Sequence, residues 1–299
     1  MIEHPAVRRD VPLAPLTTYK VGGDARYFTE PADLAELREV LALAPEGMTV
    51  VALGRGSNVV ISEAGIDGLV IKLGRSFQVA DVGPGGLIVA GAGVALAKLA
   101  RLAASCGRAG LGFYVGIPGS VGGAVRMNAG GHGSDTSQVL DHALILDAST
   151  GEVVRATCAD LGLSYRHSEL TDDDVVVQAT FSTTPRDPQL LEEELRSITR
   201  WRKEHQPGGT LNAGSVFKNP VGDHAGAIIE RIGLKGQQVG RVQVSPVHAN
   251  FLVAADDASA DDIFRFVQQI RSTVLDRTGI DLEPEVRFLG EFTDVRERG

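Results

Sequence analysis

The sequence predicts an α+β protein made of a larger first part and a smaller second part. Leucines at helical spacing recur between short β-branched runs, which is typical of helices mixed with strands. A stretch rich in proline and glycine at 206–209 follows a long predicted helix and marks the expected boundary. The chain has 299 residues, of which 43% are hydrophobic, enough for one large or two medium cores.

The first part is expected to begin as a strand, a helix and a second strand. A turn at Gly22 and Gly23 leads into a strand that ends near residue 30, and a helix follows over 31–46 with Asp33 as its cap. Gly107 is placed to end a later helix. Further strands are expected at 49–53, 59–61, 69–73, 87–91 and 175–181, helices over 94–105 and 188–205, and a hairpin at 142–147 and 152–156.

The second part is predicted as a small α+β unit. Helices are expected over 223–232 and 260–278, and strands at 249–254 and 285–289. Asp261 and Asp262 lie in the first turn of the last helix, where the helix dipole favours acidic side chains.

The net charge of −9 argues against a general nucleic-acid or anionic-membrane surface. The charge is nevertheless uneven along the chain. Between residues 196 and 241 there are eight Lys and Arg residues against three acidic ones. This local excess indicates either a site for an anionic ligand or a basic, solvated face.

The two cysteines, Cys106 and Cys158, have neither a CxxC nor a metal-ligand spacing, so we expect free thiols in a reducing compartment. The N-terminal residues lack the apolar core of a signal peptide, and no run reaches the roughly 18 apolar residues of a membrane span. We therefore expect a cytoplasmic protein with no membrane insertion, no nucleic-acid partner and no obligate protein partner. The histidines show no metal-binding spacing, so no metal site is expected.

A glycine-rich run at 112–133 holds eight glycines in 22 residues, with small apolar residues between them. Glycine inside a helix or strand costs about 0.5–1 kcal/mol relative to alanine. Such density is favoured only where the backbone takes positive φ or lies against something flat and bulky. We interpret the run as a buried, backbone-lined cradle for a cofactor.

A second glycine-containing loop, GRGSN at 54–58, follows a predicted strand. It lacks the third glycine of a GxGxxG fingerprint, because Val59 stands there, and strand rather than helix follows it. The loop can form a nest of backbone N–H groups for a phosphate. The alternative is a tight turn with an Asx-type hydrogen bond.

Eight stretches in order along nearly the whole chain, GIPGSVGGAVRMNAG and AGSVFKNP among them, resemble the UDP-N-acetylenolpyruvoylglucosamine reductase (MurB) family of peptidoglycan synthesis, in its second, shorter type. They lie at 17–28, 53–71, 116–130, 165–168, 213–220, 233–236, 244–253 and 282–290. The resemblance implies an FAD-binding region of the vanillyl-alcohol-oxidase (PCMH) type over 1–206, with subdomains of about 1–73 and 74–206. A smaller α+β substrate domain would span 207–299.

By this resemblance FAD would be held without a covalent link, and NADPH would be the co-substrate. The residues implied in FAD binding are Gly54, Arg55, Gly56, Ser57, Asn58, Pro118, Gly119, Ser120, Gly122, Gly123, Asn128, Gly130 and Arg202.

The implied reaction reduces an enolpyruvyl ether on a UDP-sugar to a lactyl ether. Ser215 would protonate C2, Arg166 would hold the substrate carboxylate, and Glu285 would act protonated or through a hydrogen-bonded relay. Without the resemblance, Ser215 is as well explained by a turn after Gly214, and Arg166 by a rim salt bridge. Glu285 is chosen over Glu283 on the family pattern alone, since the two would share a strand face.

Six further residues are implied in substrate binding: Tyr165, Lys218, Asn219, His248, Asn250 and Arg287. His205 stands where the family commonly has lysine, which weakens any charge pairing with a diphosphate there. Two other functions remain open: an FAD-linked sugar or alcohol oxidase on the same scaffold, and a non-catalytic flavin- or nucleotide-sugar-binding module.

Overall fold

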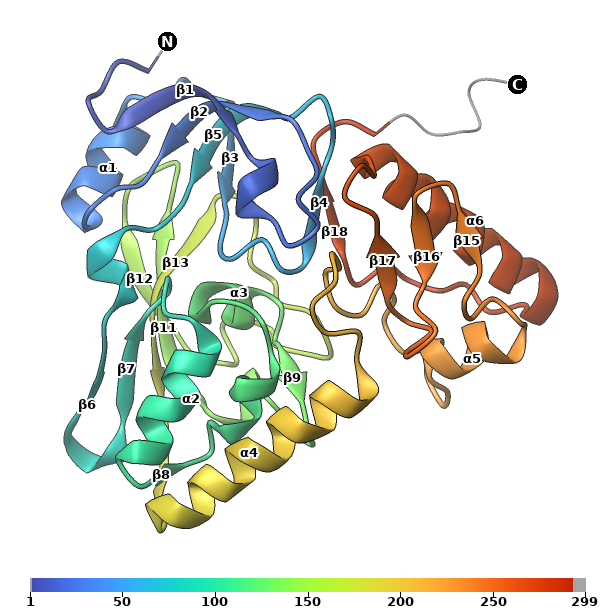
Figure 1. Ribbon diagram of the computed structural model, residues 1–299. Helices are drawn as coiled ribbons and strands as arrows, with labels where there is room; N and C mark the ends of the chain where they lie inside the picture. The colour runs from blue at the N-terminus through green and yellow to red at the C-terminus, as the bar shows by residue number, and fades with distance from the viewer. Residues whose placement is uncertain (1, 293–299) are drawn as a thin grey trace. The chain divides into compact units, whose positions relative to one another are not determined.

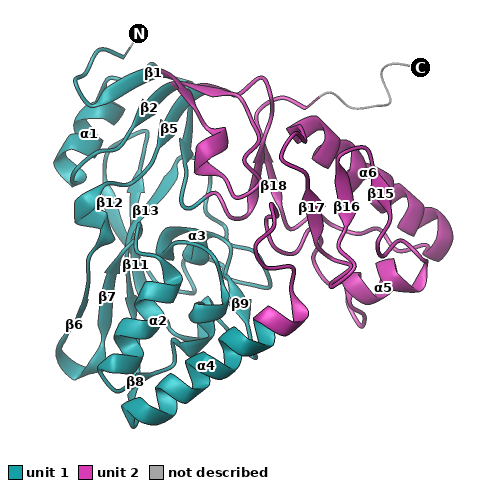
Figure 2. Cartoon of the chain, viewed as in Figure 1, with its two compact units in different colours: residues 1–9, 27–55, 68–202 teal, residues 10–26, 56–67, 203–299 magenta. Residues whose placement is uncertain are grey.

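The computed structural model describes residues 2–292 and divides the chain into two compact units (Figures 1 and 2). Unit 1 takes in the chain up to Arg9 and then residues 27–55 and 68–202. Unit 2 takes in residues 10–26, 56–67 and the chain from Lys203 onward. The last boundary between the units, after Arg202, lies close to the boundary predicted at 206–209. The two early segments of unit 2 were not expected. The assignment of FAD binding to 1–206 and of substrate binding to 207–299 stays a prediction.

Unit 1 contains a five-stranded antiparallel sheet in the order β12, β11, β13, β7 and β6. The strands are β6 (Ala80–Val82), β7 (Ile88–Gly91), β11 (Leu140–Asp147), β12 (Val153–Ala156) and β13 (Asp174–Phe181). The register sets Leu140 opposite Phe181 and Ala143 opposite Ala156. The predicted hairpin around residues 149–151 is confirmed, whereas the edge strand β6 was not predicted.

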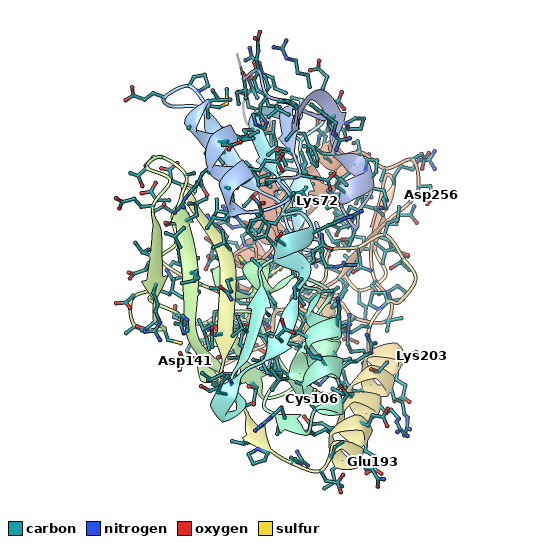
Figure 3. All side chains as sticks on the ribbon, turned by 90° about the vertical axis from the view of Figure 1, so that its left-hand side faces the viewer. Lys72, Cys106, Asp141, Glu193, Lys203 and Asp256 are labelled. Carbon is teal, nitrogen blue, oxygen red and sulfur yellow. The ribbon has the colours of Figure 1, made fainter. Side chains whose placement is uncertain are left out.

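Helix α2 (Leu96–Ser105) packs into the larger core of unit 1 through Leu99 and Ala103. It ends at Cys106, and Gly107 follows with φ +66°, the left-handed conformation that the sequence predicted for it. Cys106 is exposed at this end of the helix (Figure 3). Cys158 is half-buried, and both cysteines are free.

Helix α4 (Pro188–His205) has the bounds that the sequence predicted. Leu191, Leu195 and Ile198 recur at helical spacing and are buried in the same core. Glu193 and Lys203 point away from this core on the outer side of the helix (Figure 3).

A four-stranded sheet has the order β1, β2, β5 and β3, with β3 and β5 parallel. Its strands are β1 (Val7–Pro12), β2 (Asp24–Thr29), β3 (Thr49–Ala52) and β5 (Ile66–Ile71). Helix α1 (Leu34–Ala42) is capped by Asp33, whose side chain accepts a hydrogen bond from Glu36 N, as predicted. Leu37, Val40 and Leu41 bury its apolar face in a second core of unit 1.

Unit 2 has its own core, to which helices α5 (Ala225–Arg231) and α6 (Ala260–Thr278) contribute. The meander β15 (Gln238–Val239), β16 (Val242–Val244) and β17 (Leu252–Ala254) is antiparallel, whereas β4 (Val59–Ile61) and β18 (Arg287–Leu289) pair in parallel. Ser259 and Asp262 form a capping box at the start of α6, and Gly279 ends it at φ +72°. These local signals explain why the bounds of α6 were predicted to the residue.

Short elements escaped the sequence pattern. Helix α3 (Val121–Arg126) lies inside the glycine-rich run, where two glycines hide its helical spacing. The sequence also failed to predict β1, β15 and β16, described above. It likewise missed β8 (Arg108–Ala109), β9 (Gly130–Gly131), β10 (Ser134–Asp135) and β14 (Thr184–Pro185). Within residues 2–292, no helix is long and apolar enough to cross a membrane, and no group of acidic, histidine or cysteine side chains could hold a metal ion.

A bidentate ion pair fastens α6 to the segment that follows it. Arg271 Nε and Nη2 donate to Asp281 Oδ1 and Oδ2 at 2.6 and 2.7 Å, and this bonding lowers the pKa of Asp281 below its ordinary range. A lowered folded-state pKa means stability that is present above the ordinary pKa, near 4, and lost as the pH falls through the folded-state value. Asp281→Asn is therefore expected to lower the urea midpoint at neutral pH and to have a smaller effect at a pH well below the ordinary aspartate pKa of about 4. Equal losses at both pH values would contradict this electrostatic account.

Candidate active site

The glycine-rich run folds around the start of helix α3. Ser120 is buried and caps the helix, its Oγ accepting from Gly123 N at 3.5 Å. Val121 N donates to Val94 O, and Gly122 N donates to Ala92 O at 2.8 Å. The first amides of α3 are thus already bonded inside unit 1. The preceding turn at 118–120 and the GRGSN loop remain as the segments whose backbone could meet a phosphate.

Close backbone approach explains three of the glycines. A β-carbon on Gly54 would lie 2.5 Å from Ser120 Oγ, so the start of GRGSN packs directly on the cap of α3. A β-carbon on Gly122 would lie 3.0 Å from that of Ala92, and one on Gly130 would lie 2.6 Å from that of Asp135. Inside unit 1, Gly54 and the glycine-rich run are therefore closely packed, and the cradle that the composition predicted between them stays a prediction.

The GRGSN loop continues into unit 2, where it forms hydrogen bonds with distant segments of the chain rather than within the loop. Gly56 has φ +61°, and its carbonyl accepts from Thr18 N at 3.0 Å. Asn58 Nδ2 donates to Glu285 O at 3.0 Å, and Asn58 O accepts from Arg287 N. Asn58 therefore bonds across the β4–β18 pair and does not make the local Asx bond considered as an alternative.

Asn128, implied in FAD binding, is buried at φ +39°. Its Nδ2 donates to Ser164 O at 2.8 Å and its Oδ1 accepts from Ser137 N at 2.9 Å. The side chain thus joins the glycine-rich run to the turn that carries Tyr165 and Arg166. Its contact with FAD stays a prediction.

Arg166 is held in a strained and well-defined conformation. Its φ is +54°, which is uncommon for a residue other than glycine, and its Nη2 donates to Gly130 O at 2.7 Å. The guanidinium carbon lies 5.2 Å from the ring centre of Tyr165, which is half exposed. Strain of this kind is characteristic of active sites and ligand clamps. The structure therefore brings Tyr165 and Arg166 together with Gly130 of the cradle.

Arg202 lies near the end of α4 beside two residues that the sequence analysis missed. His132 stacks edge-to-face on Trp201 with ring centres 5.1 Å apart. Partial burial, with a smaller contribution from Arg202, lowers the pKa of His132, and burial also lowers the pKa of Arg202. His132 has φ +54° between the paired strands β9 and β10. Its place before Gly133 in a two-residue hairpin turn was the available sequence signal.

Ser215 follows a turn that other side chains already hold. Gly214 has φ +77°, and its N–H is bonded to Asn212 Oδ1 at 3.0 Å. Ser215 is half-buried, and its hydroxyl makes no hydrogen bond within residues 2–292. The turn that was considered as an alternative role for this hydroxyl is therefore satisfied without it.

The segment that carries Glu285 is paired with the segment after Ser215. Glu285 N donates to Val216 O at 2.7 Å, which brings Glu285 and Ser215 to the same part of unit 2. Glu283, by contrast, forms an ion pair with Lys218 at 2.6 Å. The two glutamates thus differ in their contacts, and only Glu283 is exposed.

The remaining predicted substrate residues lie in the same unit, and several have structural partners. Asn219 Oδ1 accepts from Ala225 N at the start of α5. His248 stacks edge-to-face on Phe251, and burial, followed by Lys235, lowers its pKa. Arg287 begins β18. Their contact with a substrate stays a prediction.

The local excess of basic residues is largely neutralised by carboxylates. Five of its eight cations form ion pairs with a carboxylate: Arg196 with Glu192, Lys218 with Glu283, Arg231 with Asp223, Lys235 with Glu230 and Arg241 with Asp257. For these five a basic, solvated face is the better description. A phosphate that bound to any of these five would have to displace its acidic partner.

Residues 25–157 match the FAD binding domain family, which makes this an FAD-binding protein. Residues 206–289 match the C-terminal domain of UDP-N-acetylenolpyruvoylglucosamine reductase. Curated proteins of that name from Rubrobacter xylanophilus and Synechococcus sp. are each 44% identical to 96% of this chain, which covers 96% and 93% of their lengths. The chain belongs to the UDP-N-acetylenolpyruvoylglucosamine reductase family.

A solved structure supports the same assignment. The crystal structure of UDP-N-acetylenolpyruvylglucosamine reductase (MurB) from Thermus caldophilus superposes with a TM-score of 0.83 at 31% identity, over 95% of this chain and 99% of that one. The predicted α+β fold, with an FAD-binding region followed by a smaller C-terminal region, is confirmed.

Proposed function

We propose that this chain reduces UDP-N-acetylglucosamine enolpyruvate to UDP-N-acetylmuramate with NADPH, through FAD. Membership of the reductase family supports this activity over an FAD-linked oxidase or a binding module. The observation that supports the flavin part is the packing of Gly54 on Ser120, which sets the start of GRGSN against the glycine-rich run.

The proposed cradle would hold a flat, bulky group with a phosphate. A β-carbon on Gly54, Gly122 or Gly130 would meet a neighbouring atom at 2.5 to 3.0 Å, so side chains are excluded from this part of the cradle. Residues 118–120 and 54–58 would offer backbone to the diphosphate. When bound, FAD supplies two-electron hydride transfer between NADPH and the substrate.

The protein must place a proton on C2 of the enolpyruvyl group once hydride has reached C3. The Ser215 hydroxyl is the proposed donor, since it is half-buried, not used by the fold, and attached to the segment paired with Glu285. Glu285 would support this proton transfer through a hydrogen bond. Arg166, a fixed planar cation, would hold the substrate carboxylate while negative charge develops beside it.

An anaerobic titration tests the function directly. The purified protein is expected to be yellow, to lose its flavin absorbance with one equivalent of NADPH, and to regain it when the enolpyruvyl UDP-sugar is added. A colourless protein, or a reduced flavin that the sugar does not reoxidise, would overturn the proposal. A separate aerobic assay tests for an oxidase. Flavin reduction by a sugar or alcohol in place of NADPH, followed by rapid reoxidation by O₂, would identify one.

A further inference from the structure

The backbone after Ser215 lies between two neighbouring segments of unit 2. On one side it pairs with residues 283–285: Glu285 N donates to Val216 O at 2.7 Å, and Lys218 N donates to Glu283 O at 2.8 Å. On the other side it is held by a single residue, Asn250. Val216 N donates to Asn250 O at 2.9 Å, so contact with Asn250 begins immediately after Ser215.

The Asn250 side chain hydrogen-bonds to both backbone groups of the next residue, Phe217. Its Oδ1 accepts from Phe217 N at 3.0 Å, and its Nδ2 donates to Phe217 O at 2.8 Å. Asn250 is only 4% exposed, and Phe217 is fully buried. Removing this amide would leave a buried N–H and a buried C=O without partners, which is costly for both groups. The segment would then shift to find new partners.

We propose that Asn250 is a positioning residue for Ser215, acting through the backbone of residues 216 and 217. This inference rests on the proposed role of Ser215 as proton donor. It replaces the substrate contact implied by the family resemblance, because the buried amide is directed at Phe217. A displacement of about 1 Å in a reacting group can cost about 10²-fold in rate, so a fixed backbone at this point has a catalytic consequence.

Asn250→Asp gives a pH-dependent test. A protonated aspartic acid has the shape of asparagine and can donate to Phe217 O while accepting from Phe217 N. An ionised aspartate has no proton to donate, so one of its oxygens would face the Phe217 carbonyl oxygen and repel it. Burial raises the pKa of an introduced aspartate, which brings its titration toward the working range of the enzyme.

The measurement is anaerobic stopped-flow kinetics of the holoenzyme, with each half-reaction followed separately. Asn250→Ala is expected to slow reduction of the enolpyruvyl UDP-sugar about 10²-fold at every pH, while flavin reduction by NADPH stays within about threefold. Asn250→Asp is expected to show the same loss near pH 9 and to recover at least tenfold toward about pH 5.5. Rates are taken relative to wild type at each pH, because the other ionisable side chains around this segment, His248, Glu283, Glu285 and Lys218, are present in all three proteins.

Ser259→Ala provides the control for general loss of stability. It removes the cap of α6 in the same unit, which destabilises the helix, without touching residues 215–218. It should lower the melting temperature and leave both half-reactions unchanged. A flat pH dependence for Asn250→Asp, or equal losses in both half-reactions, would overturn the positioning role. A wild-type enzyme that never reduces the enolpyruvyl sugar would instead overturn the proposed function.

Discussion

Ser215→Ala is expected to leave flavin reduction by NADPH near the wild-type rate and to slow reduction of the enolpyruvyl substrate by about 10²–10⁴-fold, the usual contribution of a placed proton donor. The change should be local, because Asn212 holds Gly214 and Asn250 holds Val216 without help from the Ser215 hydroxyl. Stopped-flow absorbance at the flavin band, with each half-reaction run anaerobically, separates the two effects.

Ser215→Cys is the matched variant, since a thiol retains a proton donor at the same position. It is expected to recover part of the rate that alanine loses in the second half-reaction. Equal slowing of both half-reactions by alanine would assign Ser215 to folding or to flavin binding.

Gly56→Ala is expected to destabilise the protein by more than about 3 kcal/mol, because strain and overlap add at this position. Gly56 has φ +61°, and its β-carbon would overlap Leu16 O and lie 2.7 Å from Thr17 Cα. Both obstacles are backbone, so neither can rotate away. Denaturant unfolding followed by circular dichroism measures the loss, and flavin fluorescence in the same samples reports release of FAD.

Gly240→Ala separates the two causes. Gly240 lies in the same unit with φ +56°, and among the described residues nothing lies within 4 Å of the β-carbon it would gain. This variant should lose only about 1 kcal/mol from its backbone conformation. Similar losses for the two variants would mean that the GRGSN loop yields to the overlap.

The sequence predicted local structure where the determinants lie close together in the chain. Helix α6 follows from its capping box and its C-terminal glycine, and the bounds of α4 follow from leucine and isoleucine spacing. Helix α3 was missed because glycines needed for close approach lower the very propensity that reveals a helix. The early segments of unit 2 were missed because their partners lie far along the chain.

The candidate site was predicted unevenly for the same reason. Glycine density correctly indicated close approach of the backbone, since the cause is local steric exclusion. The partners of Asn58 and Asn250 could not be predicted, because each depends on a backbone group that only the folded chain brings near. Five of the eight basic residues proved to be paired, which no count of charges along the chain could foresee.

The parallel pair of β4 and β18 also has a consequence for how the protein is made. The bond from Asn58 to Glu285 joins residues 227 positions apart, so it closes a very long loop of chain. During synthesis, strand β4 has no partner until residues 287–289 have left the ribosome. Unit 2 is therefore completed last, although residues 10–26 and 56–67 are among the first to emerge. A chain cut short before β18 would leave the GRGSN loop attached to an unpaired strand, exposed to aggregation and to proteases.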